Sequence, residues 1–149
     1  METHTTLNFT MKKLHLFILF TIFFSSFQTC FGQTVRELEK SYRDCLESGI
    51  PTTQSSLNCT YAYVVKYESV MVKTLNQLTE KLPNTLAEKL FENQTEWKNY
   101  MKSEIAFYQL FYNKVYQNGS QVRSAVLYKQ MELLKKRILV LQERIDWLN

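Results

Sequence analysis

The sequence contains little histidine, glycine, proline and cysteine: two, three, two and three residues, respectively, among 149. Both histidines, His4 and His15, lie in an N-terminal segment that we expect to be cleaved off, so the mature chain would lack the commonest general base and metal ligand. Only Gly49 and Gly119 would remain of the glycines, too few for a phosphate-binding loop or a dinucleotide fingerprint. These absences predict a protein that is not an enzyme and holds neither a cofactor nor a metal.

The N-terminal segment has the layout of a secretory signal peptide. A basic start, Met11-Lys12-Lys13, precedes an apolar run over residues 14–27, and the small residues Cys30 and Gly32 precede the expected cleavage site. The run is short for a membrane span. Two alternatives stay open: an uncleaved anchor, and a lipoprotein acylated at Cys30, which the preceding residues fit poorly. We therefore predict an upstream extension (residues 1–10), a signal peptide (11–32) and an exported domain (33–149) that is periplasmic or secreted.

Cleavage would change the net charge only slightly. Lys12 and Lys13 would leave with the signal peptide and Glu2 with the extension, so the basic residues fall from 18 to 16 and the acidic ones from 14 to 13, for a net charge of +3. These charges are spread along the chain without a polybasic block. Nucleic acid is therefore not expected as a partner, nor is a membrane beyond the signal segment.

The remaining chain has the composition of an all-α protein, because Leu, Lys, Glu and Gln are frequent and helix breakers are rare. Apolar residues recur at three- and four-residue steps, which predicts one short and three long helices packed as a bundle. Ser120 is expected to cap the last helix, and Thr53 or Ser55 the second. The expected helices cover about 34–47, 53–82, 83–118 and 120–148, separated by Gly49 with Pro51, by Pro83, and by Asn118-Gly119.

The last helix carries a heptad seam, in which steps of four and three residues alternate over three repeats. Further apolar residues widen the stripe, which favours burial inside one chain over a two-stranded coiled coil. We expect a monomer, with a dimer through these heptads as the open alternative. The seam consists of Leu127, Met131, Leu134, Ile138, Leu141, Ile145 and Leu148, and the widening residues are Val122, Val126, Leu133, Val140 and Trp147.

Cys45 and Cys59 are the two cysteines of the predicted mature domain. A zinc site would need more histidine or cysteine ligands, and a thioredoxin-type pair needs cysteines two residues apart. Two free thiols are rare in an exported protein. We therefore predict a disulfide that staples the first helix to the second, worth about 3 kcal/mol for a loop of about 15 residues.

Short motifs recur along the mature chain in a recognisable order. Asp44-Cys45, Thr52-Thr53-Gln54 and Leu57-Asn58-Cys59 come first, Leu75-Asn76 and then Gln94, Trp97 and Tyr100 follow, and Gly119-Ser120 and Arg137 come last. In this order they resemble the LprI-type lysozyme inhibitor domain, a family of small exported bacterial helical domains. The family's other two cysteines are absent together, since Ile105 and Lys129 stand near those positions. The residues that carry the resemblance are Gln54, Leu75, Asn76, Gln94, Trp97, Tyr100, Gly119 and Arg137.

The resemblance implies a binding protein that occludes the cleft of a glycosidase, with lysozyme as the expected protein partner. Lys135, Lys136 and Arg137 could then face the acidic pair of such a cleft, although a solvated basic stripe is the simpler interpretation. The alternative function is a structural or chaperone-like envelope module without lysozyme activity.

Several other residues have both a functional and a structural interpretation. Trp97 could contact a partner, but we expect a core anchor. Asn76 and Gln54 are expected to be buried polar groups that fix helix register or caps. The aromatic segment over residues 107–112 is apolar around much of its helix, so it is either a covered central segment, which we prefer, or an exposed binding patch.

Overall fold

Four α-helices make up most of the part of the chain that the computed structural model describes, residues 30–50 and 52–149. One helix is short and three are long, and no strand occurs in these residues, so the predicted all-α fold is confirmed. The expected upstream extension, most of the expected signal peptide, and Pro51 lie outside the described residues. The helices are α2 (Cys30–Ser48), α3 (Thr53–Glu80), α4 (Asn84–Val115) and α5 (Gln121–Asp146).

The helix starts follow local sequence, with two corrections. The cap of α3 is Thr52, whose Oγ1 accepts a hydrogen bond from the Ser55 backbone N–H at 3.1 Å, one residue earlier than the sequence predicted. Pro83 occupies the N-cap position of α4, where its missing N–H costs nothing. Ser120 is the N-cap residue of α5, as predicted, but its side chain does not make the expected capping hydrogen bond.

The turn between α4 and α5 is built around left-handed residues. Gln117 and Asn118 have φ values of 51° and 60°, whereas Gly119 does not have a positive φ. Position 119 requires glycine for a steric reason, because a Cβ there would lie only 2.9 Å from the Tyr116 carbonyl oxygen. The stop predicted at Asn118-Gly119 is therefore present, but Asn118 supplies the unusual backbone conformation and Gly119 supplies the space.

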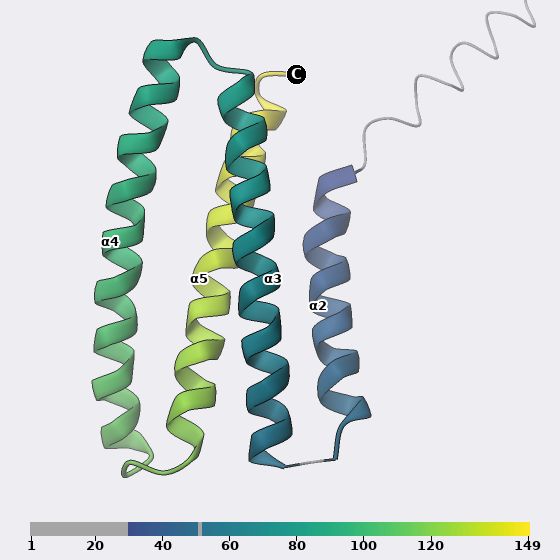
Figure 1. Ribbon diagram of the computed structural model, residues 1–149, viewed down its shortest axis with the longest axis vertical. Coiled ribbons are helices and arrows are strands. Elements are labelled where there is room, and N and C mark those ends of the chain that lie inside the picture. The colour runs from purple at the N-terminus through teal and green to yellow at the C-terminus, as the bar shows by residue number, and fades with distance from the viewer. Residues whose placement is uncertain (1–29, 51) are drawn as a thin grey trace, which may run out of the picture. The chain divides into compact units, whose positions relative to one another are not determined.

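Residues Val35–Asn149 form one compact unit. Within it α3 and α5 pack along each other, and α4 packs against α5. Figure 1 shows α3 and α5 in the middle, with α4 and α2 on opposite flanks. Each outer helix therefore has one face on the central pair and another face turned away from it.

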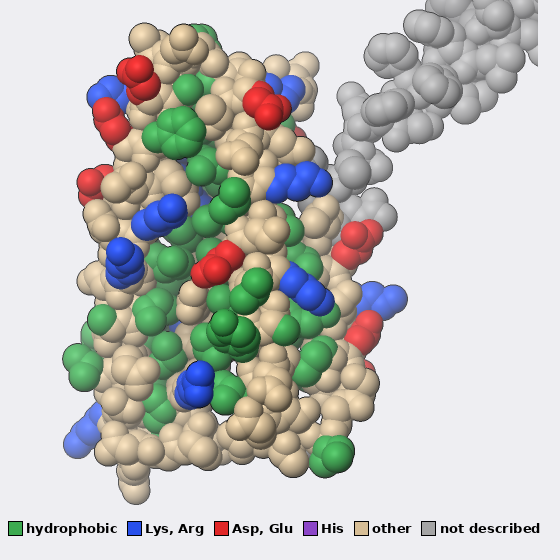
Figure 2. Space-filling view, in the orientation of Figure 1, with side chains coloured by type: hydrophobic (Ala, Val, Ile, Leu, Met, Phe, Trp, Pro, Cys, Tyr) green, Lys and Arg blue, Asp and Glu red, His purple; other side chains and the backbone are tan. Residues whose placement is uncertain are grey.

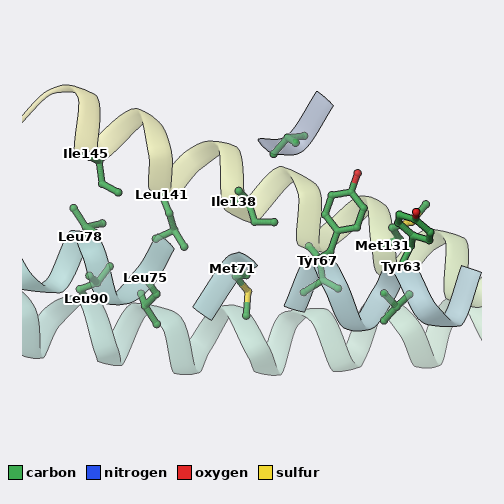
Figure 3. Packing of buried hydrophobic residues seen from close by; sticks show 13 residues of the cluster. Tyr63, Tyr67, Met71, Leu75, Leu78, Leu90, Met131, Ile138, Leu141 and Ile145 are labelled. Atoms are coloured by element: carbon green, nitrogen blue, oxygen red, sulfur yellow. The ribbon is translucent and has the colours of Figure 1, made fainter. Parts of the chain in front are cut away.

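The core is the interface between α3 and α5 (Figure 3). Leu134 and Leu141 of the heptad seam are 0% exposed, which shows that the seam is buried within one chain. The predicted widening of the stripe is only partly right, because Val140 and Trp147 are exposed, as is Leu148 at the end of the seam. The core residues labelled in Figure 3 are Tyr63, Tyr67, Met71, Leu75 and Leu78 from α3, Leu90 from α4, and Met131, Ile138, Leu141 and Ile145 from α5.

The short helix α2 is fixed by a covalent bond and a few side chains. Cys45 and Cys59 form the predicted disulfide, with a Cα–Cα distance of 6.0 Å. Tyr42 shares a hydrogen bond of 3.0 Å with Thr60 Oγ1, and its ring centroid lies 5.4 Å from that of Tyr63. These contacts hold α2 against α3.

The long helix α4 is covered on a narrow face, because Leu90 and Gln94 are its buried residues. In the aromatic segment, Phe107 is 59% and Leu110 is 72% exposed, so the preferred interpretation of a covered core segment was wrong. Its rings stack on each other instead: the centroids of Phe107 and Phe111 are 5.9 Å apart. Hydrophobic side chains accordingly reach the surface over α4 and α3 in Figure 2.

Candidate functional site

A pocket of about 300 Å³ opens between α2, α3 and α5. Tyrosine rings and a methionine give it apolar walls, and both carboxylates and cations surround them. Because the disulfide holds α2 on α3, the same bond holds one wall of the pocket. The lining residues are Glu39, Tyr42 and Arg43 from α2, Tyr67 from α3, and Tyr128, Met131, Glu132, Lys135 and Lys136 from α5.

Tyr67 is the most deeply buried residue of this lining, with 1% of its surface exposed. Its ring belongs to the core, and Figure 3 shows the hydroxyl at the outer end of the side chain. Within residues 30–50 and 52–149 this hydroxyl makes no hydrogen bond. Burial, assisted by the nearby Glu39 carboxylate, raises the pKa of Tyr67 to about 12. The hydroxyl is therefore a protonated donor at neutral pH.

Both carboxylates of the pocket are paired with lysines. The ammonium group of Lys135 donates to Glu39 Oε1, which joins α5 to α2. The ammonium group of Lys129 lies 2.6 Å from Glu132 Oε2, and this hydrogen bond raises the pKa of Lys129. Burial and then Glu132 raise the pKa of Tyr128. The negative charge of the pocket is thus already neutralised by the protein itself.

Two cations at the rim stay without such partners. Arg43 and Lys136 are exposed, and neither makes an ion pair within the described residues. With both carboxylates paired, these two side chains leave the mouth of the pocket positively charged.

On the opposite side of α5, Arg137 is buried at 6% exposure. Its Nε donates to Gln94 Oε1 at 2.9 Å, and its Nη2 donates to Asn93 Oδ1 at 2.9 Å. The guanidinium lies 5.5 Å from the centroid of the Trp97 ring. Burial and then the charge of Arg144 lower the pKa of Arg137, and no carboxylate pairs with it in the described residues. Neutral amides and an aromatic face therefore hold a desolvated cation between α4 and α5.

The three consecutive cations consequently do not form one surface. Lys135 and Lys136 line the pocket on the α2 side, whereas Arg137 faces α4 and is closed off from solvent. A helix turns by about 100° per residue, so residues 135 and 137 point in nearly opposite directions. The basic stripe proposed from sequence is thus divided between a rim and a buried contact.

A model of the family described as lysozyme inhibitor LprI matches residues 34–141. The chain belongs to the LprI family. The match extends from the first turns of α2 to near the end of α5, so it includes the disulfide, the pocket and the Arg137 contact. No curated protein and no solved structure matches the chain.

The residues that suggested LprI membership divide into buried and exposed sets. Leu75, Gln94 and Arg137 are buried, and Trp97 packs half-buried against the core. Gln54 and Asn76 are exposed, so the expectation that they are buried polar groups was wrong. Gln54 instead donates to Asn58 Oδ1 on the surface, at 2.8 Å.

The last two of these residues have no buried side chain. Tyr100 is 51% exposed on α4, and Gly119 lies in the turn before α5. The residues that carried the resemblance therefore lie in helix packing and turns at least as often as on the surface.

Two further features concern the whole described part of this LprI domain. None of its helices is long and apolar enough to cross a membrane. Within residues 30–50 and 52–149, no three acidic, histidine or cysteine side chains are grouped so that they could hold a metal ion.

Sequence reasoning missed the pocket. Tyr67 fits the three- and four-residue spacing of the apolar residues of its helix, so the spacing predicts only a core residue, and no motif marks Glu39, Arg43 or Glu132. The one available signal was Tyr67 itself, because a tyrosine among apolar residues usually places its hydroxyl in water or next to a hydrogen-bond partner.

Proposed function

We propose that this protein is an exported inhibitor of a lysozyme-type glycosidase and that it acts by covering the cleft of the enzyme. The observation that carries the proposal is the family match over residues 34–141. Export rests on the signal-peptide pattern of residues 11–32. No catalytic role is assigned to any side chain, since occlusion requires only a rigid surface that fits its target.

The surface that best suits this role is the rim formed by α2 and α5. Arg43 and Lys136 are exposed there, and Lys135 is held beside them by Glu39. Glycosidases carry a pair of carboxyl groups on either side of the bond that they cleave. Cationic side chains on helices would lie opposite this acidic pair. This complementary charge would speed the association of the two proteins and orient the inhibitor in the cleft.

A lysozyme turnover assay tests the proposal. The purified protein should lower turnover in proportion to its concentration, and the charge reversals Arg43→Glu and Lys136→Glu should each weaken inhibition by about tenfold. Lys98→Glu is the matched control, because Lys98 is an exposed lysine on α4, away from the rim. No inhibition at a large molar excess would reject the function, and equal loss in the control would reject the surface.

The alternative is a structural or chaperone-like envelope module, and the exposed aromatic side chains of α4 favour it. Phe107, Leu110 and Phe111 leave much apolar surface uncovered, which is uncommon on a protein without partners. A protein of this kind would suppress aggregation of an unfolded model protein without slowing lysozyme. Phe107→Ser should then weaken the suppression, whereas Lys136→Glu should not.

A further inference from the structure

We propose that the pocket between α2, α3 and α5 binds a small cyclic hydroxylated carboxylate of the uronic acid class. This ligand site would exist whether or not the protein inhibits lysozyme. Four properties of the pocket carry the inference: a tyrosine hydroxyl that faces the pocket and has no hydrogen-bond partner in the described residues, a positive mouth, aromatic walls and a suitable volume.

The hydroxyl is that of Tyr67, whose ring is buried while its oxygen can be reached from the pocket. A polar group that lines a ligand site needs a hydrogen-bond partner in the complex, because a ligand that displaces water from it without replacing the bond loses affinity. Tyr67 is 1% exposed, lines the pocket, and has no such partner within the described residues. A ligand oxygen in the pocket would complete this bond by accepting the Tyr67 proton.

The charges at the mouth select an anion. Glu39 and Glu132 are each paired with a lysine of α5, so they do not offer an uncompensated negative charge to a cationic ligand. Within residues 30–50 and 52–149, Arg43 and Lys136 make no ion pair. A carboxylate at the mouth would pair with one or both of them through charge-assisted hydrogen bonds.

The walls and the volume favour a compact ring that carries hydroxyl groups. Tyr42, Tyr128 and Met131 present apolar surface that can contact the C–H face of a sugar ring. A volume of about 300 Å³ lies at the lower end of the range for small-molecule pockets, which fits a monosaccharide better than an oligosaccharide. Acceptors around such a ring can reach Tyr67 inside while the carboxylate stays at the mouth.

The test is a titration of the ¹⁵N-labelled purified protein with D-glucuronate, followed by NMR. We expect binding in the millimolar range, with shifts concentrated at the backbone amides of Glu39, Tyr67 and Lys135. D-Glucose lacks the carboxylate and acetate lacks the hydroxyl groups, so both should bind at least about tenfold more weakly. The absence of glucuronate binding up to about 50 mM would overturn the proposal.

Two variants and a control assign the site. Tyr67→Phe removes one oxygen and should weaken glucuronate binding about three- to tenfold. Lys136→Gln changes an exposed side chain without disturbing the core and should also weaken it. Tyr61→Phe alters an exposed tyrosine of the same helix outside the pocket and should leave binding unchanged.

The alternative results are equally informative. If glucose binds as tightly as glucuronate, the pocket does not select its ligand by charge. If acetate binds as tightly, the ligand does not need hydroxyl groups. If Tyr67→Phe binds glucuronate with unchanged affinity, Tyr67 does not contact the ligand. Because lysozyme takes no part in the titration, a negative result here is distinct from a failure of the inhibition assay.

Discussion

Gln94→Leu tests whether Gln94, one of the residues that suggested LprI membership, acts by holding α4 against α5. Gln94 is 3% exposed, and its Oε1 accepts from Arg137 Nε at 2.9 Å. Leucine has a similar volume, so the main change is the loss of an acceptor for a buried guanidinium. A hydrogen bond to a charged group contributes about 1.5–3 kcal/mol, and the cation stays desolvated after the loss. We expect the free energy of unfolding to fall by about 2–3 kcal/mol.

The double variant Gln94→Leu/Arg137→Met makes this expectation sharper. Replacing a buried polar pair by apolar side chains of similar size is often neutral, whereas removing one partner is destabilising. The double variant should therefore lie within about 1 kcal/mol of the parent protein and recover most of the loss of Gln94→Leu.

Urea unfolding with linear extrapolation measures these differences. Gln109→Leu is the matched control, because Gln109 is an exposed glutamine of α4 that donates to Asn113, and its replacement should change stability by less than about 0.5 kcal/mol. If the Gln94→Leu and Arg137→Met effects simply add in the double variant, the Gln94–Arg137 bond does not stabilise the contact between α4 and α5.

Two further predictions concern the disulfide and the pocket. Cys45→Ala/Cys59→Ala removes a link that spans 14 residues, so urea unfolding should show a loss of about 3 kcal/mol and hydrogen exchange should speed up most in α2; a uniform change along the chain would contradict this. For Tyr67, the unfolded phenol ionises near its ordinary pKa of 10.0 while the folded one keeps its proton up to about 12. As the pH rises from 10 to about 12, the free energy of unfolding should therefore fall by roughly 2–3 kcal/mol through Tyr67. The variant Tyr67→Phe should lack this contribution to the pH dependence.

The sequence predicts the helices well because their ends depend on local chemistry. Pro83 and the turn after α4 interrupt the apolar periodicity whatever the rest of the chain does. The heptad seam of α5 is likewise a local pattern, and most of its residues are buried within the chain, whereas part of the wider stripe is exposed. The disulfide follows from exclusion, since the predicted mature domain has only one cysteine pair.

The sequence does not predict which apolar helix faces are covered by another helix. Phe107 and Leu110 have the same hydrophobicity as buried residues, but α4 packs on the central pair along a narrow face, and nothing in the described part of the chain covers the remainder. Periodicity identifies the face of a helix that can be buried, whereas the arrangement of helices decides whether it is. Gln54 and Asn76 illustrate the same limit for polar residues, because both were expected inside and both are exposed.

The pocket escapes sequence reasoning for a related reason. Its lining comes from three helices, and Glu39 and Lys135 are 96 residues apart. No short motif can encode such a contact. A tyrosine at an apolar position of a helix indicates only that its hydroxyl must reach water or a hydrogen-bond partner. The pocket that the hydroxyl of Tyr67 faces is formed only when the disulfide holds α2 against α3.

Residues 135–137 face two different sides of α5, so a partner protein cannot contact all three cations at once. A target that approaches the α2 side meets Arg43 and Lys136 on an accessible rim. A target that required Arg137 would have to separate α4 from α5, break the bonds to Gln94 and Asn93, and expose the indole of Trp97. That opening costs free energy before any contact with the target is gained, since it exposes the apolar surface that α4 and α5 bury against each other. Under the proposed function, Arg137 would support binding by keeping α4 and α5 together, and direct recognition of an acidic cleft would fall to the cations on the α2 side.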